Sequence, residues 1–417
     1  MTWSSPVAAI RGRPPERSPL APRILVLCDH YLPGFRAGGP IRTLSTLVQQ
    51  LGREFTFCVI TRDHDFGEAH SFPEVESDTW YVVGKANVKY VGRRERSWWR
   101  LLRRVRAVPY DVLYINSLFS LHFGIKPLML RRLRLLRRTP VVLAPRGELA
   151  PDALALGRTK KYLYLLVAEK VGFYRDITWQ ASSVYEQADI VRRFGEGVRV
   201  SVAPNLSPVD NVPPAERLES KRGGEVRIVF LSRIAPMKNL VTALELLREL
   251  NGRVELDIYG PREDPSYWRE CERMIQLMPS NVSAKYCGAV EHEHVASTLA
   301  KYDLLLLPTL GENFGHVILE ALHSGRPVLI SDRTPWRGLE AAGCGWDFPL
   351  DRPSQFREAL QACIDMDAHD WEKASRAARA MALAHSRDTT ALAASRALLQ
   401  EASAAQARRS QKSRVAL

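Results

Sequence analysis

Short apolar runs alternate with helix-length segments along almost the whole chain. This alternation is typical of parallel βαβ units, in which each strand is followed by a helix that crosses back over the sheet. A stretch at 204–224 interrupts it with four prolines, two closing glycines and no apolar periodicity, and the alternation then restarts. Since 417 residues are too many for one hydrophobic core, we predict an α/β protein of two doubly wound Rossmann-like domains joined by a linker.

The expected elements set the domain boundaries. Strands are predicted at 24–27, 56–60, 81–83, 112–115, 141–144 and 177–180 in the first half, and at 226–231, 254–259, 282–286, 304–307 and 328–331 in the second. From these we expect a flexible N-terminal arm at 1–22, an N-terminal domain at 23–205, a linker at 206–224 and a C-terminal domain at 225–385. A C-terminal helix at 386–404, which could pack back on the N-terminal domain, and a basic tail at 405–417 would complete the chain.

Composition excludes several classes of protein. No stretch approaches 18 consecutive apolar residues, and the first residues contain no sustained apolar run, so neither a membrane span nor export is expected. The six cysteines are scattered, without CxxC spacing or a histidine at zinc-ligand spacing, which indicates buried thiols in a reducing compartment. We therefore expect a cytoplasmic location.

The net charge of +13 requires an anionic partner or surface. The segment RRERSWWRLLRRVR (93–106) would form a basic amphipathic helix with Trp98, Leu101, Leu102 and Val105 on its apolar face. Such a helix suits an anionic membrane surface, although a solvated helix packed by its apolar side is an alternative.

A second run of five arginines at 131–138 lies in the same half of the chain. Together the two segments predict a peripheral protein on the inner face of a membrane. Nucleic acid is a more distant candidate partner and is not expected, because the chain has no RNP, KH or helix-turn-helix signature.

Two loops of the second half carry residues that can bind a diphosphate or a polyol. In FLSRIAPMKNL (230–240), Arg233 and Lys238 lie between a predicted strand and a predicted helix. The carboxyl ends of parallel strands are where such sheets bind ligands, and a helix N-terminus adds partial positive charge. The two cations therefore form a candidate diphosphate site, although such a pair in a loop is more often solvated.

The stretch PTLGENFGHVILEAL (308–322) has the same order of strand, loop and helix. The amide groups of Asn313, Phe314 and Gly315 would face an anion at the helix start. Glu312 would instead accept hydrogen bonds from the hydroxyls of a neutral polyol, and Glu320 from a diol such as ribose. Alternatively, Glu312 is only a favourable charge at a helix N-terminus and Glu320 an exposed helical residue. A ligand that has a diphosphate between two hydroxylated rings is a nucleotide sugar.

With these motifs the chain resembles the retaining GT-B glycosyltransferases of family 4, the glycosyl transferases group 1. The resemblance runs from about residue 24 to residue 404, and its carriers are AGGP (37–40), APRGELAPDAL (144–154), SRIAPMKNL (232–240), PTLGENFGHVILEAL (308–322), GRPVLISDRTPW (325–336) and GCGWDFPLD (343–351). The resemblance implies that the two Rossmann-like domains face a central cleft.

The resemblance also assigns roles to matching residues. Arg233, Lys238 and Glu312 would be the catalytic group, with the two cations on the diphosphate and Glu312 on the transferred sugar. Donor contacts are implied for Gly38, Gly39, Asn313, Phe314, Gly315 and Glu320. The family generally needs no bound metal, and no cofactor beyond the donor substrate is expected.

Acceptor residues are predicted less directly. His30 and Tyr31 follow the first strand and would face either the acceptor or the protein interior. Arg146 and Gly147 stand where many relatives carry a histidine, and they resemble a subgroup with PRG-type loops. The DHD sequence at 63–65 could suggest a metal site, but a polar loop after a strand explains it equally well.

The expected function is transfer of a sugar, with retained anomeric configuration, from a nucleotide-diphosphate sugar to a glycan or lipid-linked acceptor in bacterial surface polysaccharide biosynthesis. The expected donor is a UDP-sugar, with GDP- and ADP-sugars as alternatives. A sugar-nucleotide epimerase or a phosphorylase would use the same fold.

Overall fold

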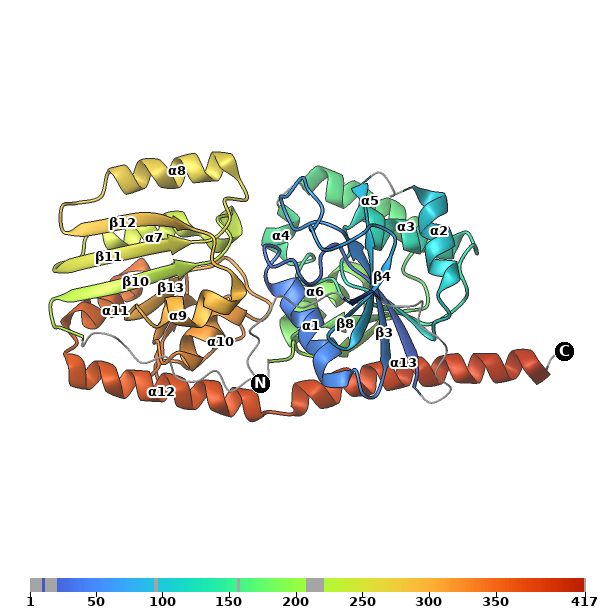
Figure 1. Ribbon diagram of the computed structural model, residues 1–417. Coiled ribbons are helices and arrows are strands. Elements are labelled where there is room, and N and C mark those ends of the chain that lie inside the picture. Colours follow the sequence, from blue (N-terminus) through green and yellow to red (C-terminus); the bar gives the residue numbers. More distant parts are fainter. Residues whose placement is uncertain (1–9, 12–20, 94–96, 156–157, 208–220, 416–417) are drawn as a thin grey trace. The chain divides into compact units, whose positions relative to one another are not determined.

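The computed structural model describes residues 10–11, 21–93, 97–155, 158–207 and 221–415 (Figure 1). The chain divides into two compact units. Unit 1 consists of Met1–Leu206 and Thr389–Leu417, and unit 2 of Ser207–Asp388. These divisions fall close to the predicted boundaries at 205/206 and 385/386. Most of the predicted N-terminal arm and of the predicted linker lies outside the described residues.

Unit 1 is built on one mixed sheet. In the described part of the chain its order is β1-β4-β5-β3-β2-β6-β7-β8-β9, with β4 antiparallel to β1 and β5 and the other pairs parallel. The strands are β1 (Ile10–Arg11), β2 (Arg23–Leu27), β3 (Thr56–Arg62), β4 (Trp80–Val83), β5 (Ala86–Val91), β6 (Val112–Ile115), β7 (Val141–Leu143), β8 (Ile177–Ala181) and β9 (Arg199–Val202). The strand order reverses between β2 and β6, so the loops after these two strands diverge at the carboxyl edge.

One part of the predicted flexible arm is ordered. Ile10 and Arg11 form β1 and pair with Val82 and Tyr81 at the edge of the sheet. A strand of two residues is too short to give an apolar periodicity, so the sequence pattern does not reveal it.

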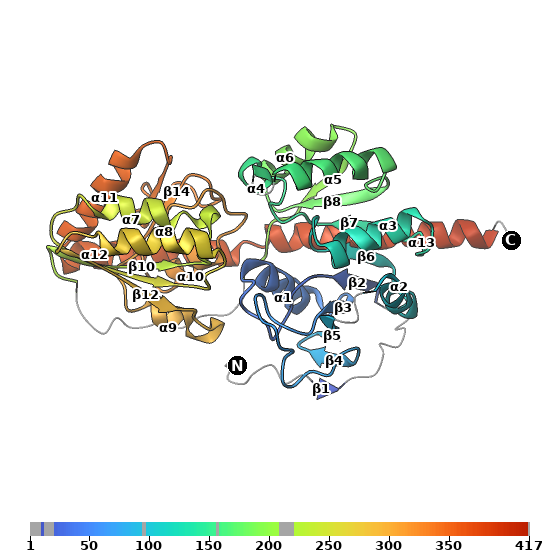
Figure 2. The same cartoon turned by 90° about the horizontal axis from the view of Figure 1, so that it is seen from above.

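Helices cover both faces of the unit 1 sheet (Figure 2). They are α1 (Gly39–Leu51), α2 (Trp98–Ala107), the π-helical turn η2 (Leu121–Ile125), α3 (Lys126–Arg132), α4 (Pro151–Ala155), α5 (Arg158–Val171), α6 (Val184–Phe194) and α13 (Thr390–Val415). One core includes inward residues of α2, α3, α5 and α6, and another includes those of α1 and α13. Strands buried on both faces explain the continuous apolar runs of the sequence.

Unit 2 is a parallel doubly wound domain. Its described strands are ordered β12-β11-β10-β13-β14-β15, and all pairs are parallel. They are β10 (Glu225–Leu231), β11 (Arg253–Tyr259), β12 (Val282–Gly288), β13 (Leu304–Leu307), β14 (Val328–Ser331) and β15 (Gly345–Phe348). The helical segments are η3 (Pro236–Lys238), α7 (Leu240–Leu247), α8 (Pro265–Gln276), η4 (His292–His294), α9 (Val295–Leu299), α10 (His316–His323), α11 (Pro353–Asp365) and α12 (Ala368–Arg387). The order reverses between β10 and β13.

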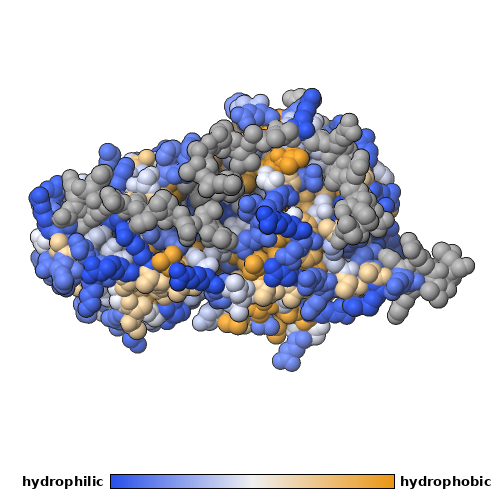
Figure 3. All heavy atoms as spheres, turned by 60° about the horizontal axis from the view of Figure 1, so that its bottom comes forward, coloured by the Kyte–Doolittle hydropathy of each residue, from blue (hydrophilic) through white to orange (hydrophobic). Residues whose placement is uncertain are grey.

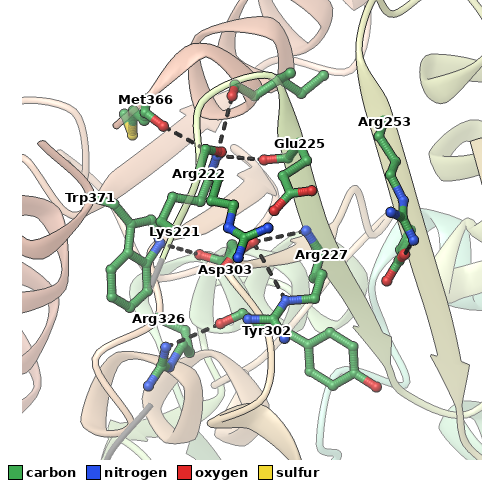
Figure 4. A network of polar contacts seen from close by, with 12 residues as sticks. Lys221, Arg222, Glu225, Arg227, Arg253, Tyr302, Asp303, Arg326, Met366 and Trp371 are labelled. Atoms are coloured by element: carbon green, nitrogen blue, oxygen red, sulfur yellow. Dashed lines mark hydrogen bonds and ion pairs between the residues drawn. The ribbon is translucent and has the colours of Figure 1, made fainter. Parts of the chain in front are cut away.

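A polar network lies where β10 begins (Figure 4). The buried Lys221 donates hydrogen bonds to the carbonyl oxygens of Arg222 (2.7 Å), Glu225 (2.5 Å), Ile364 (3.2 Å) and Met366 (3.2 Å). The ammonium group therefore joins the start of β10 to the end of α11.

Neighbouring groups secure β13 at the same end of the sheet. The buried Asp303 accepts from the Arg227 amide at 2.9 Å through its carboxylate, and from Trp371 Nε1 at 3.0 Å through its carbonyl oxygen (Figure 4). The network therefore fixes β10 and β13 side by side, which positions the loops at their opposite ends.

The end of the chain differs from the prediction. Helix α13 continues to Val415, so the residues expected as a separate basic tail from 405 onward extend a helix. Leu398, Leu399 and Ala402 of α13 are buried in the core of unit 1. Arg396 also forms a two-bond ion pair with Glu54, at 2.7 and 2.9 Å. Alanine-rich sequence favours this continuation, because alanine has the highest helix propensity.

Figure 3 colours the surface by hydropathy, and hydrophilic residues predominate on the face that it shows. Within the described ranges, none of the helices combines the length and apolar character needed to cross a bilayer.

Candidate active site

The reversal of strand order in unit 2 brings two predicted loops together. β10 pairs directly with β13, with Ile228 opposite Leu304 and Val229 opposite Leu305. The loop after β10 carries Arg233 and Lys238, and the loop after β13 carries Glu312. A crevice outside the carboxyl ends of the strands, at such a reversal, is the usual ligand site of an open α/β sheet.

Hydrogen bonds fasten these two loops to each other. The Met237 carbonyl oxygen accepts from the Leu310 amide and from Thr309 Oγ1, both at 2.9 Å. Asn239 Nδ2 donates to the Pro308 carbonyl oxygen at 2.9 Å. Asn239 also takes a left-handed conformation with φ 59°, which asparagine tolerates better than most residues. The loops therefore form one connected structure at the sheet edge.

Lys238 and Glu312 form an ion pair across the two loops, in which Nζ donates to Oε1. Only 9% of Lys238 is exposed, and 15% of the Glu312 side chain. The sequence placed Lys238 on a diphosphate and Glu312 on a sugar, and the structure shows that the two groups also neutralise each other. A bound diphosphate would compete with the carboxylate for the ammonium group.

The loop after Glu312 presents backbone amides at the start of α10. The Glu312 amide donates to the Arg333 carbonyl oxygen at 2.9 Å. Within the described part of the chain, the amides of Asn313, Phe314 and Gly315 donate to no acceptor. Amides in this position can bind anionic or hydroxyl oxygens.

Gly315 and Phe314 shape this loop. Gly315 has φ 75°, and a Cβ atom there would lie 2.6 Å from Ile318 Cδ1. The Phe314 side chain is buried, and its carbonyl oxygen accepts from Trp336 Nε1 at 2.5 Å. Phe314 can thus contribute a backbone amide to a ligand while its ring belongs to the core.

Arg233 forms a separate ion pair, with NH1 lying 2.8 Å from Oε2 of Glu263. The Arg233 side chain is 37% exposed. Glu263 follows β11 and therefore also lies at the carboxyl edge of the sheet. Sequence reasoning missed Glu263, because only the strand order shows that the β10 and β11 loops are neighbours.

Glu320 lies on α10, four residues after the first helical residue, His316. Its side chain is half-buried, and α10 packs against α12. The structure thus puts Glu312 in the loop and Glu320 on the helix, which is the arrangement the sequence predicted. The assignment of Glu320 to a ribose remains a prediction.

His30 and Tyr31 follow β2, at the reversal of the unit 1 sheet. Tyr31 is 2% exposed and belongs to the core, where burial raises the pKa of its hydroxyl; its position favours the structural role. His30 is half-buried, with its ring 5.7 Å from that of Phe66. Burial and the nearby Arg62 guanidinium lower the pKa of His30, so its neutral form is favoured. His30 is therefore the better acceptor candidate of the two.

Gly38 and Gly39 begin α1. Gly38 has φ 67° and ψ −125°, a conformation that only glycine adopts without strain. The preceding residues are held by Asp65, whose carboxylate accepts from the amides of Phe35 (2.9 Å) and Arg36 (3.1 Å). Asp65 was part of the apparent DHD metal motif, and it instead fixes the loop that leads to the glycines.

The other two residues of the DHD sequence have protein partners as well. Asp63 Oδ1 lies 2.8 Å from His64 Nδ1, and its Oδ2 accepts from Ser71 Oγ at 2.8 Å. Both residues are buried. A set of loop contacts thus accounts for the motif.

Arg146 is held in a fixed position after β7. Its Nε donates to Asn116 Oδ1 (2.8 Å), its NH1 to Asn205 Oδ1 (2.6 Å) and its NH2 to the Tyr114 hydroxyl (2.7 Å). All three partners are neutral, so they orient the guanidinium group without cancelling its charge. Arg146 also has φ 54°, a strained conformation for a residue with a side chain.

The neighbouring loop residues are held by two acids, the buried Glu186 and the half-buried Glu148. The Gly147 amide donates to Glu186 Oε1 at 2.5 Å. Glu148 accepts from the amide of Leu118 at 2.5 Å and from Ser117 Oγ at 2.9 Å, and burial raises the pKa of Glu148 to about 7. Sequence reasoning missed these acids and Asn205. Their position after strands was the available signal, but their partners lie 30 or more residues away.

One group in the described ranges could hold a metal ion by geometry: Glu291, Glu293 and His294. All three are exposed, and they follow β12 at the edge of the sheet. His294 Nδ1 lies 4.0 Å from a carboxylate oxygen of each glutamate. Exposed acidic groups of this kind are common without an ion, and we assign no role to them.

Known proteins resemble both the sequence and the fold. Residues 215–380 match the family described as glycosyl transferases group 1. This range contains Arg233, Lys238, Glu312 and Glu320. This part of the chain, less than half of its 417 residues, is similar to the group 1 glycosyl transferases.

A curated relative is the phosphatidyl-myo-inositol mannosyltransferase of Mycobacterium tuberculosis, which is 28% identical over 182 residues. The match covers 42% of this chain and 47% of the relative, so the chain spans about half the length of that protein.

Solved structures share the fold at lower identity. Sucrose-phosphate synthase of Thermosynechococcus elongatus has a TM-score of 0.64 at 15% identity, covering 95% of this chain and 100% of that one. Anabaena HepE, solved with UDP and glucose, has a TM-score of 0.65 at 17% identity, covering 92% and 99%. The chain therefore has the GT-B fold of two Rossmann-like α/β units.

Proposed function

We propose that this protein transfers a sugar from a nucleotide-diphosphate sugar to a glycan or lipid-linked acceptor, with retention of anomeric configuration. The observation that carries this proposal is the Lys238–Glu312 pair at the reversal between β10 and β13, beside three amides that have no acceptor in the described part of the chain. A cation, a carboxylate and a helix N-terminus in one place suit a ligand that has both phosphate and hydroxyl groups.

The reaction chemistry agrees with these residues. Breaking the glycosidic bond leaves negative charge on the departing diphosphate, which Lys238, Arg233 and the α10 amides would stabilise. Glu312 would bind a hydroxyl group of the transferred sugar. Departure and attack on the same face give retention without a protein nucleophile, and no metal is assigned to the reaction.

The donor and acceptor classes rest on similarity. HepE, a structural neighbour, was solved with UDP-glucose, which supports a UDP-sugar first and a GDP- or ADP-sugar next. The name of the mycobacterial relative includes a lipid acceptor, phosphatidyl-myo-inositol. Another neighbour, WaaG, is a glycosyltransferase involved in lipopolysaccharide biosynthesis, with a TM-score of 0.59. We propose a role in bacterial surface polysaccharide biosynthesis, in the cytoplasm at the inner face of a membrane.

The test is a panel of UDP-, GDP- and ADP-sugars, with release of nucleoside diphosphate measured with and without membrane-extracted glycolipid acceptors. Acceptor-dependent release, together with sugar in the lipid fraction, supports transfer. Release of nucleoside diphosphate together with free sugar would instead indicate hydrolysis, and an isomerised donor without such release would indicate epimerisation. Phosphate-dependent formation of a sugar phosphate from a glycan would indicate a phosphorylase.

Lys238→Ala is expected to lower the transfer rate by about 10²-fold or more, since it removes charge at the leaving group. Lys301→Ala, at an exposed position in unit 2, is the matched control and should leave the rate unchanged. Equal rates for both variants would contradict the assignment of Lys238.

A further inference from the structure

Helix α5 (Arg158–Val171) carries apolar residues on both of its sides. Its inward residues Leu165 and Ala168 are buried in the core of unit 1. Its outward side carries Leu163, Val167 and Val171, which are 62%, 50% and 41% exposed and recur at intervals of four residues. Apolar residues that gather on an exposed surface often mark a site of protein or membrane interaction.

The exposed strip extends beyond α5. Tyr162 lies on the same helix and is 59% exposed. Leu133, 64% exposed, follows α3, and the adjacent Arg132 Nε donates to the Val171 carbonyl oxygen at 2.6 Å. The end of α3 therefore lies beside the end of α5. We call Tyr162, Leu163, Val167, Val171 and Leu133 the apolar strip.

Helix α2 continues this side of the unit. Trp98 and Trp99 are 38% and 77% exposed, and Lys126 Nζ of α3 lies 5.2 Å from the centre of the Trp98 ring. Helices α2, α3 and α5 lie next to one another in both ribbon views (Figures 1 and 2). All three direct their inner residues into the same core, so their outer residues share one face of unit 1.

The charge of this face has one dominant sign. Four lysines and arginines occur in α2, three in α3 and four in α5, against one acidic residue, Glu169. Glu169 is paired with Arg193. The arginines divide into two kinds. Arg104 is buried and bonded to Asp78, while Arg100 and Arg103 are exposed.

We propose that the face formed by α2, α3 and α5 docks on a bilayer that contains anionic lipid, with the apolar strip of α5 inserted at the headgroup level. Exposed tryptophans and aliphatic side chains beside lysines and arginines are the composition of a helix lying in the membrane interface. A protein partner of ordinary composition would not match so uniform a positive charge, whereas an anionic lipid surface does. At 14 residues, α5 is long enough to lie in the interface and too short to cross the bilayer.

This inference adds an element to the sequence prediction. The sequence pointed to 93–106 and 131–138, whereas the structure adds α5, which carries four exposed apolar residues together with Lys160 and Lys170. It deepens the proposed function by naming the surface that would meet a lipid-linked acceptor, and it rests on that function only for the identity of the acceptor.

The experiment is flotation of the full chain with vesicles of phosphatidylcholine alone, or of phosphatidylcholine mixed with phosphatidylglycerol, at low and high salt. We expect binding to the mixed vesicles only, weakened by salt. The double variant Leu163→Ser and Val167→Ser should bind at least about tenfold more weakly, since it removes buried apolar area. Lys160→Glu with Lys170→Glu should also weaken binding, by about fivefold or more per residue.

Matched controls lie in unit 2. Leu277→Ser and Leu383→Ser change equally accessible apolar residues, 67% and 41% exposed, and should leave vesicle binding unchanged. The unfolding midpoint should stay the same in all variants because the side chains are exposed. The emission of Trp99 should shift to the blue on the mixed vesicles, and Trp99→Phe should remove most of that shift.

Three results would overturn the inference. The first is that the protein does not bind the mixed vesicles at low salt. The second is that the strip variants and the control variants lose vesicle binding equally. The third is that the protein forms a dimer without lipid and the strip variants abolish that dimer, which would make the face a contact between copies. Glu312→Ala should bind vesicles as the unchanged chain does. Vesicle binding without sugar transfer would therefore refute only the proposed function, and transfer to a soluble acceptor without vesicle binding would refute only this inference.

Discussion

At the scale of single residues, the candidate site consists of charges that already have partners. Lys238 is paired with Glu312 and Arg233 with Glu263. Such pairs keep the cations oriented at the sheet edge, where an isolated buried ammonium group would be unfavourable. A diphosphate carries more charge than one carboxylate, so it can replace these contacts when it binds.

The two glutamates should respond differently to donors. Glu320→Ala is expected to weaken binding of the bare nucleoside diphosphate and of the nucleotide sugar alike by about 1–3 kcal/mol, because hydrogen bonds to the ribose are lost. The thermal shift that each ligand causes should therefore become smaller. Glu312→Ala should reduce the shift with the nucleotide sugar more than with the bare nucleotide. Glu358→Ala, at an exposed position on α11, is the control. An unchanged shift for Glu320→Ala would contradict the ribose assignment.

At the scale of elements, local sequence signals placed most strands but missed some. β5 forms a hairpin with β4 through a turn made of Gly84 and Lys85, in which Gly84 has φ 58°. β5 was missed because this turn lacks the Asn-Gly sequence that usually identifies a hairpin. β9 and β15 were missed because they are short edge strands with polar residues. Pairing with β8 and β14 makes them strands, and that pairing is not a local property.

The start of α1 depends on a glycine. Gly38→Ala is expected to lower the free energy of unfolding by about 1–2 kcal/mol, because its positive φ is unfavourable for a residue with a Cβ atom. Gly197→Ala is the matched control, since its φ is not positive and a Cβ atom there would touch nothing within 4 Å. Denaturant unfolding measures both, and equal effects would show that the Gly38 conformation is not required.

The start of β10 depends on a buried ammonium group. Lys221→Met is expected to destabilise unit 2 by about 1–3 kcal/mol, because the four carbonyl oxygens that accept from Nζ would lose that donor inside the protein. Lys373→Met, exposed on α12, should change the stability by less than about 0.5 kcal/mol. Denaturant unfolding would measure the loss of stability, and hydrogen exchange in β10 and β13 would show where in unit 2 it occurs. A similar loss in both variants would mean that the contacts of Lys221 contribute little.

At the scale of the whole molecule, the chain forms unit 1, then unit 2, and returns to unit 1 through α13. The last helix therefore stabilises the first domain rather than the domain that precedes it. The sequence raised this packing as one possibility, because an alanine-rich helix has few features that identify its partner.

Leu399 tests this arrangement. It is 1% exposed in the core of unit 1, so Leu399→Ala should destabilise unit 1 by about 2–5 kcal/mol through lost packing. Unit 2 should keep its hydrogen-exchange protection and its donor-induced shift. Gln400→Ala, at the next and exposed position of α13, is the control. Loss of protection in β10–β15 would show instead that the two units unfold together.

The sequence by itself determined the succession of strands and helices, the presence of two α/β domains and the loops that carry Arg233, Lys238 and Glu312. These follow from apolar periodicity and from glycine and proline positions, which act over a few neighbouring residues. The strand order, the pairing of Lys238 with Glu312, the neutral contacts of Arg146 and the exposure of the outward side of α5 were decided by the tertiary structure. Each depends on segments that are distant in the chain becoming neighbours, and packing and strand pairing select those neighbours rather than any local pattern.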